Sequence, residues 1–531
     1  MPLPFYRRST LALTALIAVT LGACFERGGK HKPAATASDA GLLDAAPAPA
    51  DSGWLVRDPD SPRDPAATVT IALEAEPASL DVFTTTDAAQ QRVLGDVYEG
   101  LLCAAPGREP SPCLAERHQV SPDGRVWHFW LRQGVVFHDD TALTAADVIA
   151  SVRAPGQGAA ATGPLAPLVD DLIAAESPAP GEVILRFAGA RGTRARDLTL
   201  LPIAPARSLG TDALASRPIG TGPLVMTSWK RGEELLTLRN DRYWGPPASA
   251  ARVVHRVVAD RAEALRLVAS GSVDVALQVP ITDAIAAAHD GVARFRYEQP
   301  AFLAAIYNAR RPALVSPAAR RALTALLDRE GVARTILGGA RVPAGPWPPG
   351  SREAESTIRP VPFDRALAGK LLGDVRPAVE LLVPLGSTSA ARIADVWAAD
   401  ARGLAAIRVV SVPFGELLGR LASGDFDVAI TSMSGGPDVD LWSRLSSKAP
   451  PSEAWCGLAD PALDALLDAH RAALDPAARA EAARAVHRRI DELAPMAFIA
   501  VDTRAGVARP GVGGVAGGQL PRMRDLWKRA P

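Results

Sequence analysis

Residues 114–148 read LAERHQVSPDGRVWHFWLRQGVVFHDDTALTAADV, and this stretch decides the fold class. The segment 125–132 alternates, which places Trp127 and Phe129 on one side of a predicted strand and His128 and Trp130 on the other. Farther on, 144–147 is a capping-box variant, Thr-Ala-Ala-Asp, that predicts the start of a helix. A strand, a turn and a helix in succession indicate a mixed α/β protein.

The rest of the chain repeats this pattern of strands and capped helices. Strands are predicted at 69–73, 379–383, 407–412 and 428–431. Helix starts are predicted where a capping side chain stands before proline or three residues before a polar partner, at Asp87, Ser316-Pro317, Asp460-Pro461 and Asp475-Pro476. The helix that begins at Asp87 is predicted to present one apolar face made of Val93, Leu94, Val97, Tyr98 and Leu101.

Composition limits the class of protein. The chain has 531 residues, 48% of them hydrophobic, which suits two or three domains with separate cores. Its 58 basic and 58 acidic residues balance, and no basic stripe occurs, so a nucleic-acid partner has no electrostatic support. No short repeat is found, which argues against a solenoid or a propeller.

The N-terminus predicts export. A basic pair, Arg7-Arg8, precedes the apolar segment 11–23, which is too short to span a membrane as a helix. Leu21-Gly22-Ala23-Cys24 looks like a lipobox, so residues 1–23 are predicted to be a lipoprotein signal peptide and Cys24 the lipidated first residue of the mature chain. An ordinary cleaved signal is the alternative, and the two arginines leave a twin-arginine export route open. Residues 24–66, rich in Ala, Pro, Asp and Ser, are predicted to be a disordered tether.

Four cysteines occur, and three remain once Cys24 is assigned to lipid. Cys103 and Cys113 flank a turn-rich loop that a disulfide could close in an oxidising compartment, although the sequence leaves this open. Cys456 would then be unpaired. No CxxC and no close histidine pair accompanies these cysteines, so no metal site and no cofactor are predicted.

Several segments together resemble one family. The stretch 114–148 is the most specific, and similar runs occur in order before and after it, so that the likeness covers about 68 to 503. These runs are Glu76-Pro77-Ala78-Ser79-Leu80-Asp81, Val93-Leu94-Gly95-Asp96-Val97-Tyr98-Glu99-Gly100-Leu101, Pro218-Ile219-Gly220-Thr221-Gly222-Pro223, Tyr243-Trp244-Gly245, Gly271-Ser272-Val273-Asp274-Val275, Asp328-Arg329-Glu330 and Gly424-Asp425-Phe426-Asp427-Val428. They resemble the extracellular solute-binding proteins of family 5, which serve ABC importers of peptides and nickel. Asp139-Asp140 departs from the usual Asp-Gly of that family, so Asp140 must tolerate a left-handed backbone.

The resemblance implies an α/β fold of the type II periplasmic-binding-protein class. This fold is a clamshell of two α/β lobes with a small domain inserted in the first. We expect lobe I to comprise 67–98 with 201–300 and 501–531, the inserted domain to comprise 99–200, and lobe II to comprise 301–500. A cleft between lobes can bury most of a small solute, and closure then accompanies binding.

The resemblance also places the ligand site, with less precision. Peptide-binding relatives hold the peptide amino group with an aspartate after the strand at 428–431, and an ungapped comparison puts Gly436 there, with Asp438 and Asp440 just beyond. Either aspartate is a candidate, although 435–438 is equally a simple turn. Further candidates for the cleft wall, each also suited to a core position or a loop, are Trp442, Trp347, Met433, Asp81 and Thr84.

The function implied is capture of a peptide or similar small solute and its delivery to the permease subunits of an ABC importer. The protein would be a periplasmic monomer anchored by lipid to the inner or the outer membrane. A receptor of the same fold that does not feed an importer is one alternative. A hydrolase is the other, but no HExxH, GxSxG or SxxK motif occurs, so an enzyme is not predicted.

Overall fold

The computed structural model describes residues 62–84, 87–104, 109–287, 292–435, 439–515 and 520–530. The predicted signal peptide, the lipidation site Cys24, most of the predicted tether and the candidate Asp438 lie outside these residues. Residues 62–66, assigned to the tether from sequence, are instead packed on the C-terminal segment. The amide of Ala530 donates to the carbonyl of Pro62, and the Arg63 guanidinium lies over the Trp527 ring.

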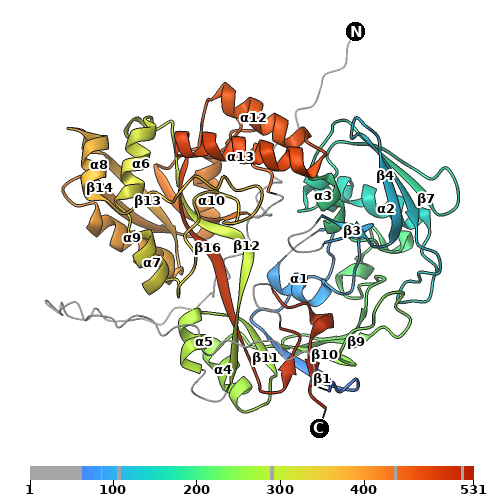
Figure 1. Ribbon diagram of the computed structural model, residues 1–531. Coiled ribbons are helices and arrows are strands. Elements are labelled where there is room, and N and C mark those ends of the chain that lie inside the picture. The colour runs from blue at the N-terminus through green and yellow to red at the C-terminus, as the bar shows by residue number, and fades with distance from the viewer. Residues whose placement is uncertain are drawn as a thin grey trace.

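One sheet of ten strands, in the order β14-β13-β15-β12-β16-β11-β1-β10-β9-β8, connects two lobes (Figure 1). Its two longest strands, β12 (Ala293–Tyr307) and β16 (Met496–Ala508), pair antiparallel and run from one lobe into the other. Their register shifts between Glu298 and Phe302, where Pro300 offers no amide donor. This irregularity divides the pair into one half for each lobe.

Lobe I lies on the β11-to-β8 side of the sheet. The strand predicted at 69–73 is β1, and it pairs in parallel with both β10 and β11. The strands are β1 (Thr68–Leu73), β8 (Leu224–Lys230), β9 (Glu234–Arg239), β10 (Arg252–Val257) and β11 (Val275–Val279), and the helices are α1 (Ala88–Leu94), α4 (Arg261–Ala269) and α5 (Ile281–Ala287). Two short strands near the C-terminus, β17 (Val512–Gly513) and β18 (Trp527–Lys528), pair antiparallel with each other.

A separate four-stranded antiparallel sheet, β4-β5-β7-β6, stands beside lobe I, and we call this part the small domain. The predicted alternation is confirmed, since Trp127, Phe129 and Leu131 are buried on β5. The capping box is confirmed too, because Thr144 and Asp147 cap α2 reciprocally. The elements are β4 (Ala115–Val120), β5 (Val126–Leu131), β6 (Leu172–Glu176), β7 (Glu182–Phe187), α2 (Ala145–Arg153), α3 (Arg194–Leu200) and the hairpin β2 (Leu102–Cys103) with β3 (Ser111–Pro112).

Lobe II covers both faces of its part of the sheet with helices. Alternate residues of β13 enter opposite cores, Leu381 facing one and Leu382 the other, as expected for a strand buried on both faces. The predicted caps Ser316, Asp460 and Asp475 begin α6, α12 and α13. The elements are β13 (Ala378–Pro384), β14 (Ala406–Val412), β15 (Val428–Ser434), α6 (Pro317–Ala325), α7 (Arg329–Thr335), α8 (Arg365–Leu372), α9 (Thr388–Asp400), α10 (Phe414–Ser423), α11 (Trp442–Leu445), α12 (Pro461–Ala472) and α13 (Pro476–Leu493).

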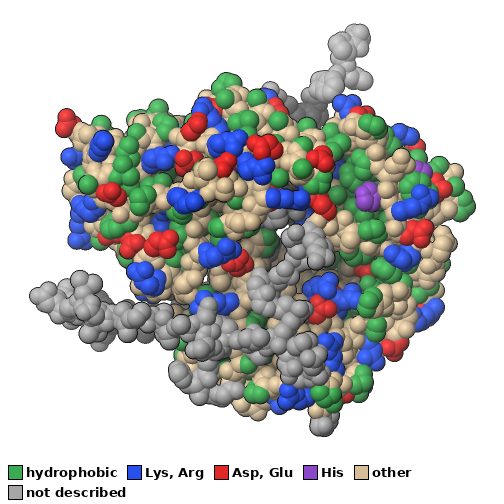
Figure 2. All heavy atoms as spheres, in the orientation of Figure 1, with side chains coloured by type: hydrophobic (Ala, Val, Ile, Leu, Met, Phe, Trp, Pro, Cys, Tyr) green, Lys and Arg blue, Asp and Glu red, His purple; other side chains and the backbone are tan. Residues whose placement is uncertain are grey.

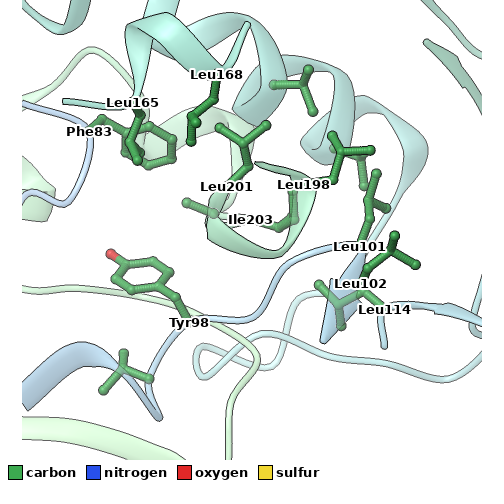
Figure 3. Close-up of a cluster of buried hydrophobic side chains, with 14 of the residues drawn as sticks. Phe83, Tyr98, Leu101, Leu102, Leu114, Leu165, Leu168, Leu198, Leu201 and Ile203 are labelled. Atoms are coloured by element: carbon green, nitrogen blue, oxygen red, sulfur yellow. The ribbon is translucent and has the colours of Figure 1, made fainter. Parts of the chain in front are cut away.

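The motif 95–101 serves to join lobe I to the small domain. The helix predicted to continue through Leu101 ends at Leu94, because the next backbone groups bond other segments: the carbonyls of Asp96 and Val97 accept from Leu224 and Gly222. The apolar side chains after the helix are nevertheless buried, and Figure 3 shows Leu101, Leu102 and Leu114 in one cluster with Leu198, Leu201 and Ile203.

Glu99 is the polar centre of this junction. Its buried carboxylate accepts hydrogen bonds from Tyr243 Oη (2.7 Å), Thr221 Oγ1 (2.8 Å) and Trp244 Nε1 (3.0 Å). Burial raises the pKa of Glu99, and the three donors act against that rise. Thr221, from the motif 218–223, and Tyr243 with Trp244, from the motif 243–245, therefore bond the same carboxylate. Asp140 adopts φ of 69°, as its place in the turn predicted.

Replacing Glu99 by alanine should lower the free energy of unfolding by about 2–4 kcal/mol, because three donors lose their acceptor and a hole remains. Guanidinium denaturation of the purified protein measures this. Glu182→Ala, which removes a half-exposed partner of His128, is the control and should cost less than about 1 kcal/mol. Equal losses in the two variants would contradict the central role of Glu99.

Candidate functional site

The lobes meet on two sides. On one side β12 and β16 cross from lobe to lobe; on the other, the turn between α12 and α13 touches the small domain next to α3 (Figure 1). The amide of Gly192 donates to the carbonyl of Arg471 at 2.6 Å across that second contact. Figure 2 shows acidic and basic side chains intermixed over this face of the molecule, as the zero net charge implies.

A hollow of about 310 Å³, including the part open to solvent, lies where the two lobes join. It sits against the irregular segment of β12 and the residue that follows β15. Its lining is mostly apolar and is made by Glu298, Gln299, Pro300, Ala301, Phe302, Pro343, Gly345, Pro346, Trp347, Pro348, Gly435 and Val501. An apolar hollow with a few polar groups at a junction of lobes is the usual form of a ligand site.

Two of the residues predicted for the cleft wall belong to the core of lobe II. Met433, at the end of β15, is 4% exposed. Trp347 is 1% exposed and packs between His470 and His487, although its ring also forms part of the hollow's wall. Burial lowers the pKa of both histidines. Trp347 thus links the hollow to α12 and α13.

Asp440 and Trp442 lie together just beyond the part of the loop that the structure leaves undescribed. Asp440 Oδ1 accepts from the amide of Trp442 at 3.0 Å, and its Oδ2 lies 3.1 Å from Arg471 Nε. Trp442 donates through Nε1 to Asp468 at 2.7 Å, and the Arg471 guanidinium lies over its ring. The two predicted residues therefore form one charged cluster on the edge of lobe II that faces the small domain.

On lobe I, Asp81 and Thr84 occupy the loop after β1. Asp81 Oδ1 accepts from the amide of Phe83 at 2.9 Å, and the Thr84 hydroxyl donates to the Asp81 carbonyl at 3.5 Å. These bonds shape a local turn. The structure does not bring this loop into hydrogen-bond contact with Asp440 or Trp442 among the interactions of the described residues.

Facing Asp440 from the small domain is Asp197, a residue that the sequence did not mark. Arg191 lies 3.5 Å from Asp197 and 3.0 Å from Asp170. Burial raises the pKa of Asp197 to about 6; Arg191 and Arg194 act against this rise, and Asp440 adds to it. The pairing of Gly192 with Arg471, which itself holds Asp440, places these two acidic groups at the same interlobe contact.

A second unpredicted cluster lies in lobe I near the end of β1. The buried guanidinium of Arg92 pairs with Glu74, and burial lowers the pKa of Arg92 to about 10. Burial, followed by repulsion from Arg92, lowers the pKa of His255 to about 3. Gln278, near the end of β11, adopts φ of 57°, and its backbone N–H donates to Tyr297 Oη at 3.0 Å. Strained backbone and buried charge of this kind concentrate at functional sites, and no sequence motif pointed to them.

Among the described residues, one group has the donors and spacing of a metal site, namely Glu99, Cys103 and Cys113. The structure joins the two cysteines in a disulfide, so their sulfurs are not available as thiolate ligands. The third cysteine within the described ranges, Cys456, is buried, and burial raises the pKa of its thiol to about 12.

The fold and the hollow between lobes define a two-lobed binding protein. The chain matches, over residues 109–450, the family model described as "Bacterial extracellular solute-binding proteins, family 5 Middle". The chain therefore belongs to the family 5 bacterial extracellular solute-binding proteins. Its α/β clamshell fold, expected from sequence, is confirmed. The boundaries assigned to the lobes and the inserted domain stay a prediction.

Relatives and solved structures agree with this membership. The chain is 30% identical to Protein XP55 of Streptomyces lividans over 421 residues, covering 74% of this chain and 76% of that protein. It is 28% identical to the probable di/tripeptide-binding protein 5 of Pseudomonas aeruginosa strain UCBPP-PA14, over 77% and 85% of the two chains. The periplasmic binding protein DppA of Helicobacter pylori, solved with the peptide STSA, superposes with a TM-score of 0.73 at 20% identity, covering 88% and 98% of the two chains.

Within the described ranges, no helix combines the length and the apolar character needed to cross a bilayer.

The pKa of Asp197 rises from 3.8 to about 6 on folding, which fixes the sign of its effect on stability. Between these pH values the folded state holds a proton that the unfolded state has lost, so the contribution is full below pH 3.8 and is lost as pH rises through about 6. Asp197→Asn should therefore gain about 1–3 kcal/mol over the parent at pH 7–8 and nothing near pH 4.

Denaturation curves at several pH values between 4 and 8 measure this difference. Asp170→Asn is the matched control, because its 59% exposed carboxylate contacts the same Arg191, and it should change stability by less than about 1 kcal/mol. A gain for Asp197→Asn that is equal at pH 4 and pH 8 would contradict the assignment.

Proposed function

We propose that the protein captures a short peptide between its lobes and delivers it unaltered to the permease subunits of an ABC importer. Family membership supports a role in solute binding. The relative at 28% identity that is named a probable di/tripeptide-binding protein favours a peptide of that length as ligand.

The observation that carries the peptide assignment is the acidic pair, Asp440 and Asp197, contributed by opposite sides of the cleft. Like charges at one contact repel, and each carboxylate already has an arginine partner, Arg471 for Asp440 and Arg191 for Asp197, so a ligand cation would add to these pairs or displace an arginine. The amino group of a peptide is such a cation and forms charge-assisted hydrogen bonds with carboxylates. The apolar hollow with Trp347 and Phe302 in its wall suits peptide side chains.

The candidate residues keep distinct roles in this proposal. Asp438 and Asp440 are the alternatives for the carboxylate that holds the amino group, and Trp442 packs beside that group. Asp81 and Thr84 contribute from the loop of lobe I when the lobes close. Met433 acts indirectly, since it supports the end of β15 from the core.

We also propose that the bound peptide is not hydrolysed. Three of the histidines, His255, His470 and His487, are at most 2% exposed, so they cannot reach a peptide in the cleft to act as a general base. Binding and release are then the whole activity.

Outside the cleft, we propose that Cys24 carries lipid and that 24–61 tethers a monomeric body to the envelope membrane in the periplasm. The family description, which names extracellular proteins, supports the compartment. Which of the two bacterial membranes carries the anchor is left to experiment.

Di- and tripeptides with a free amino group should raise the melting temperature of the purified protein, because a ligand at a hundredfold excess over its Kd adds about 2.7 kcal/mol to stability. The same peptides after N-acetylation should bind at least about tenfold more weakly, since a buried carboxylate then lacks its partner. Thermal shift followed by titration calorimetry measures both effects.

Asp438→Ala and Asp440→Ala, compared with the control Asp425→Ala in the exposed segment just after α10, decide which carboxylate holds the amino group. The affected variant should lose the preference for the free amine. Peptides cleaved on incubation would overturn the binding role, and a melting point raised only by nickel complexes would overturn the choice of peptide. Unchanged peptide affinity in both variants would remove the two aspartates from the site.

Cys24→Ser should move the protein from the membrane fraction to the soluble periplasmic fraction, because the sulfur that accepts the lipid is lost. Cell fractionation and detergent phase separation measure the distribution. Retention of Cys24→Ser in the membrane fraction would exclude a lipid anchor at that residue.

A further inference from the structure

The contact that closes the cleft opposite the crossing strands is centred on one buried arginine. Arg479, in the first turn of α13, is 7% exposed at its side chain. Its Nη2 donates to Glu109 Oε1 at 2.9 Å and to Oε2 at 3.1 Å, and its Nη1 lies 3.3 Å from the carbonyl of Gly192. Glu109 and Gly192 belong to the small domain and its connecting loop, so the bonds to these two residues cross the cleft. Arg479 also donates to the carbonyl of Leu474, just before α13, and has a further partner.

Glu109 also receives a second arginine from lobe II. Arg352 Nη2 donates to Glu109 Oε1 at 2.8 Å, so one carboxylate accepts from two guanidinium groups on different segments. The Cys103–Cys113 disulfide closes the loop that presents Glu109, which limits how far that carboxylate can move. We call Glu109, Arg352 and Arg479 the Glu109 latch.

The surfaces beside the latch fit only in this arrangement. A Cβ added to Gly192 would lie 2.2 Å from the carbonyl oxygen of Ala473, in the turn between α12 and α13. A Cβ on Gly124 would lie 2.8 Å from the methyl carbons of Leu474 in the same turn. The small domain therefore presents glycines where the turn between α12 and α13 lies against it, and a larger side chain at either position would disturb the contact.

The hydrogen bonds that Arg352 and Arg479 donate to Glu109 join the two sides of the cleft and are lost when the lobes separate. Such contacts favour the closed arrangement whatever ligand is bound, and they compete with the hydration that both charged groups regain on opening.

We propose that the Glu109 latch sets the fraction of closed protein and thereby slows the release of bound ligand. This inference rests on the proposed function for its effect on ligand release, whereas its effect on closure is independent of any ligand.

The amide of Gly192 reports closure directly, because it donates across the cleft to Arg471. Hydrogen exchange followed by mass spectrometry on the full mature protein without ligand measures it. Glu109→Gln removes the charge and keeps the shape, and should accelerate exchange at residue 192 by about 3- to 10-fold. Gly192→Ala should do the same through steric contact alone, since this glycine does not need a positive φ.

The matched control is Glu481→Gln, which breaks ion pairs with Arg484 and Arg488 on the same helix without crossing the cleft. It should leave exchange at residue 192 unchanged. For a di- or tripeptide that binds the parent, stopped-flow release should be about 3- to 10-fold faster in Glu109→Gln, and the acceleration of release by 0.5 M salt in the parent should be largely absent in this variant.

Unchanged exchange in both Glu109→Gln and Gly192→Ala would overturn the latch. Faster exchange with unchanged release of a bound peptide would overturn its role in ligand retention. If no peptide binds the parent but exchange at residue 192 still responds to Glu109→Gln, the proposed function fails and the latch stands.

Discussion

The antiparallel pairing of β12 with β16 is the constraint on which the rest of the structure depends. Two strands that run through both lobes force the lobes to share one sheet, and the pairing is irregular where the chain passes from one lobe to the other. The register shift between Glu298 and Phe302 lies at that point, and the apolar hollow lies against it. In the proposed function the ligand lies beside this irregular segment, so that binding and movement of the lobes about the segment are coupled.

Carboxylate side chains then hold neighbouring strands together on each side of this irregular segment. Asp274 precedes β11 and accepts the amide of Thr70 in β1; Asp427 precedes β15 and accepts the amide of Glu380 in β13. Each lobe thus uses the same device, an aspartate that ties the start of one parallel strand to its neighbour. Glu99 likewise joins lobe I to the small domain by accepting hydrogen bonds. The motifs that carry the family resemblance are largely these structural groups, which explains why they identify the fold more sharply than the ligand.

Charge across the cleft has two parts with opposite effects. Asp440 and Asp197 are like charges at one contact, and the arginines that pair with them, Arg471 and Arg191, reduce their repulsion, whereas Glu109 with its two arginines favours closure at the outer contact. Trp347, packed between the hollow and the histidines of α12 and α13, connects the inner site with the helices that bear the latch.

The sequence by itself determined whatever depends on neighbours along the chain. Alternation placed Trp127 and Phe129 in a core, capping side chains set the starts of α1, α2, α6, α12 and α13, and the turn at Asp140 required a left-handed backbone. It misplaced the end of α1, because the backbone at 96–97 bonds a segment more than a hundred residues away. Only the tertiary structure brought Asp197 to Asp440 and Glu109 to Arg479, since such pairs have no local period or spacing and exist only once strands have crossed and two lobes face each other.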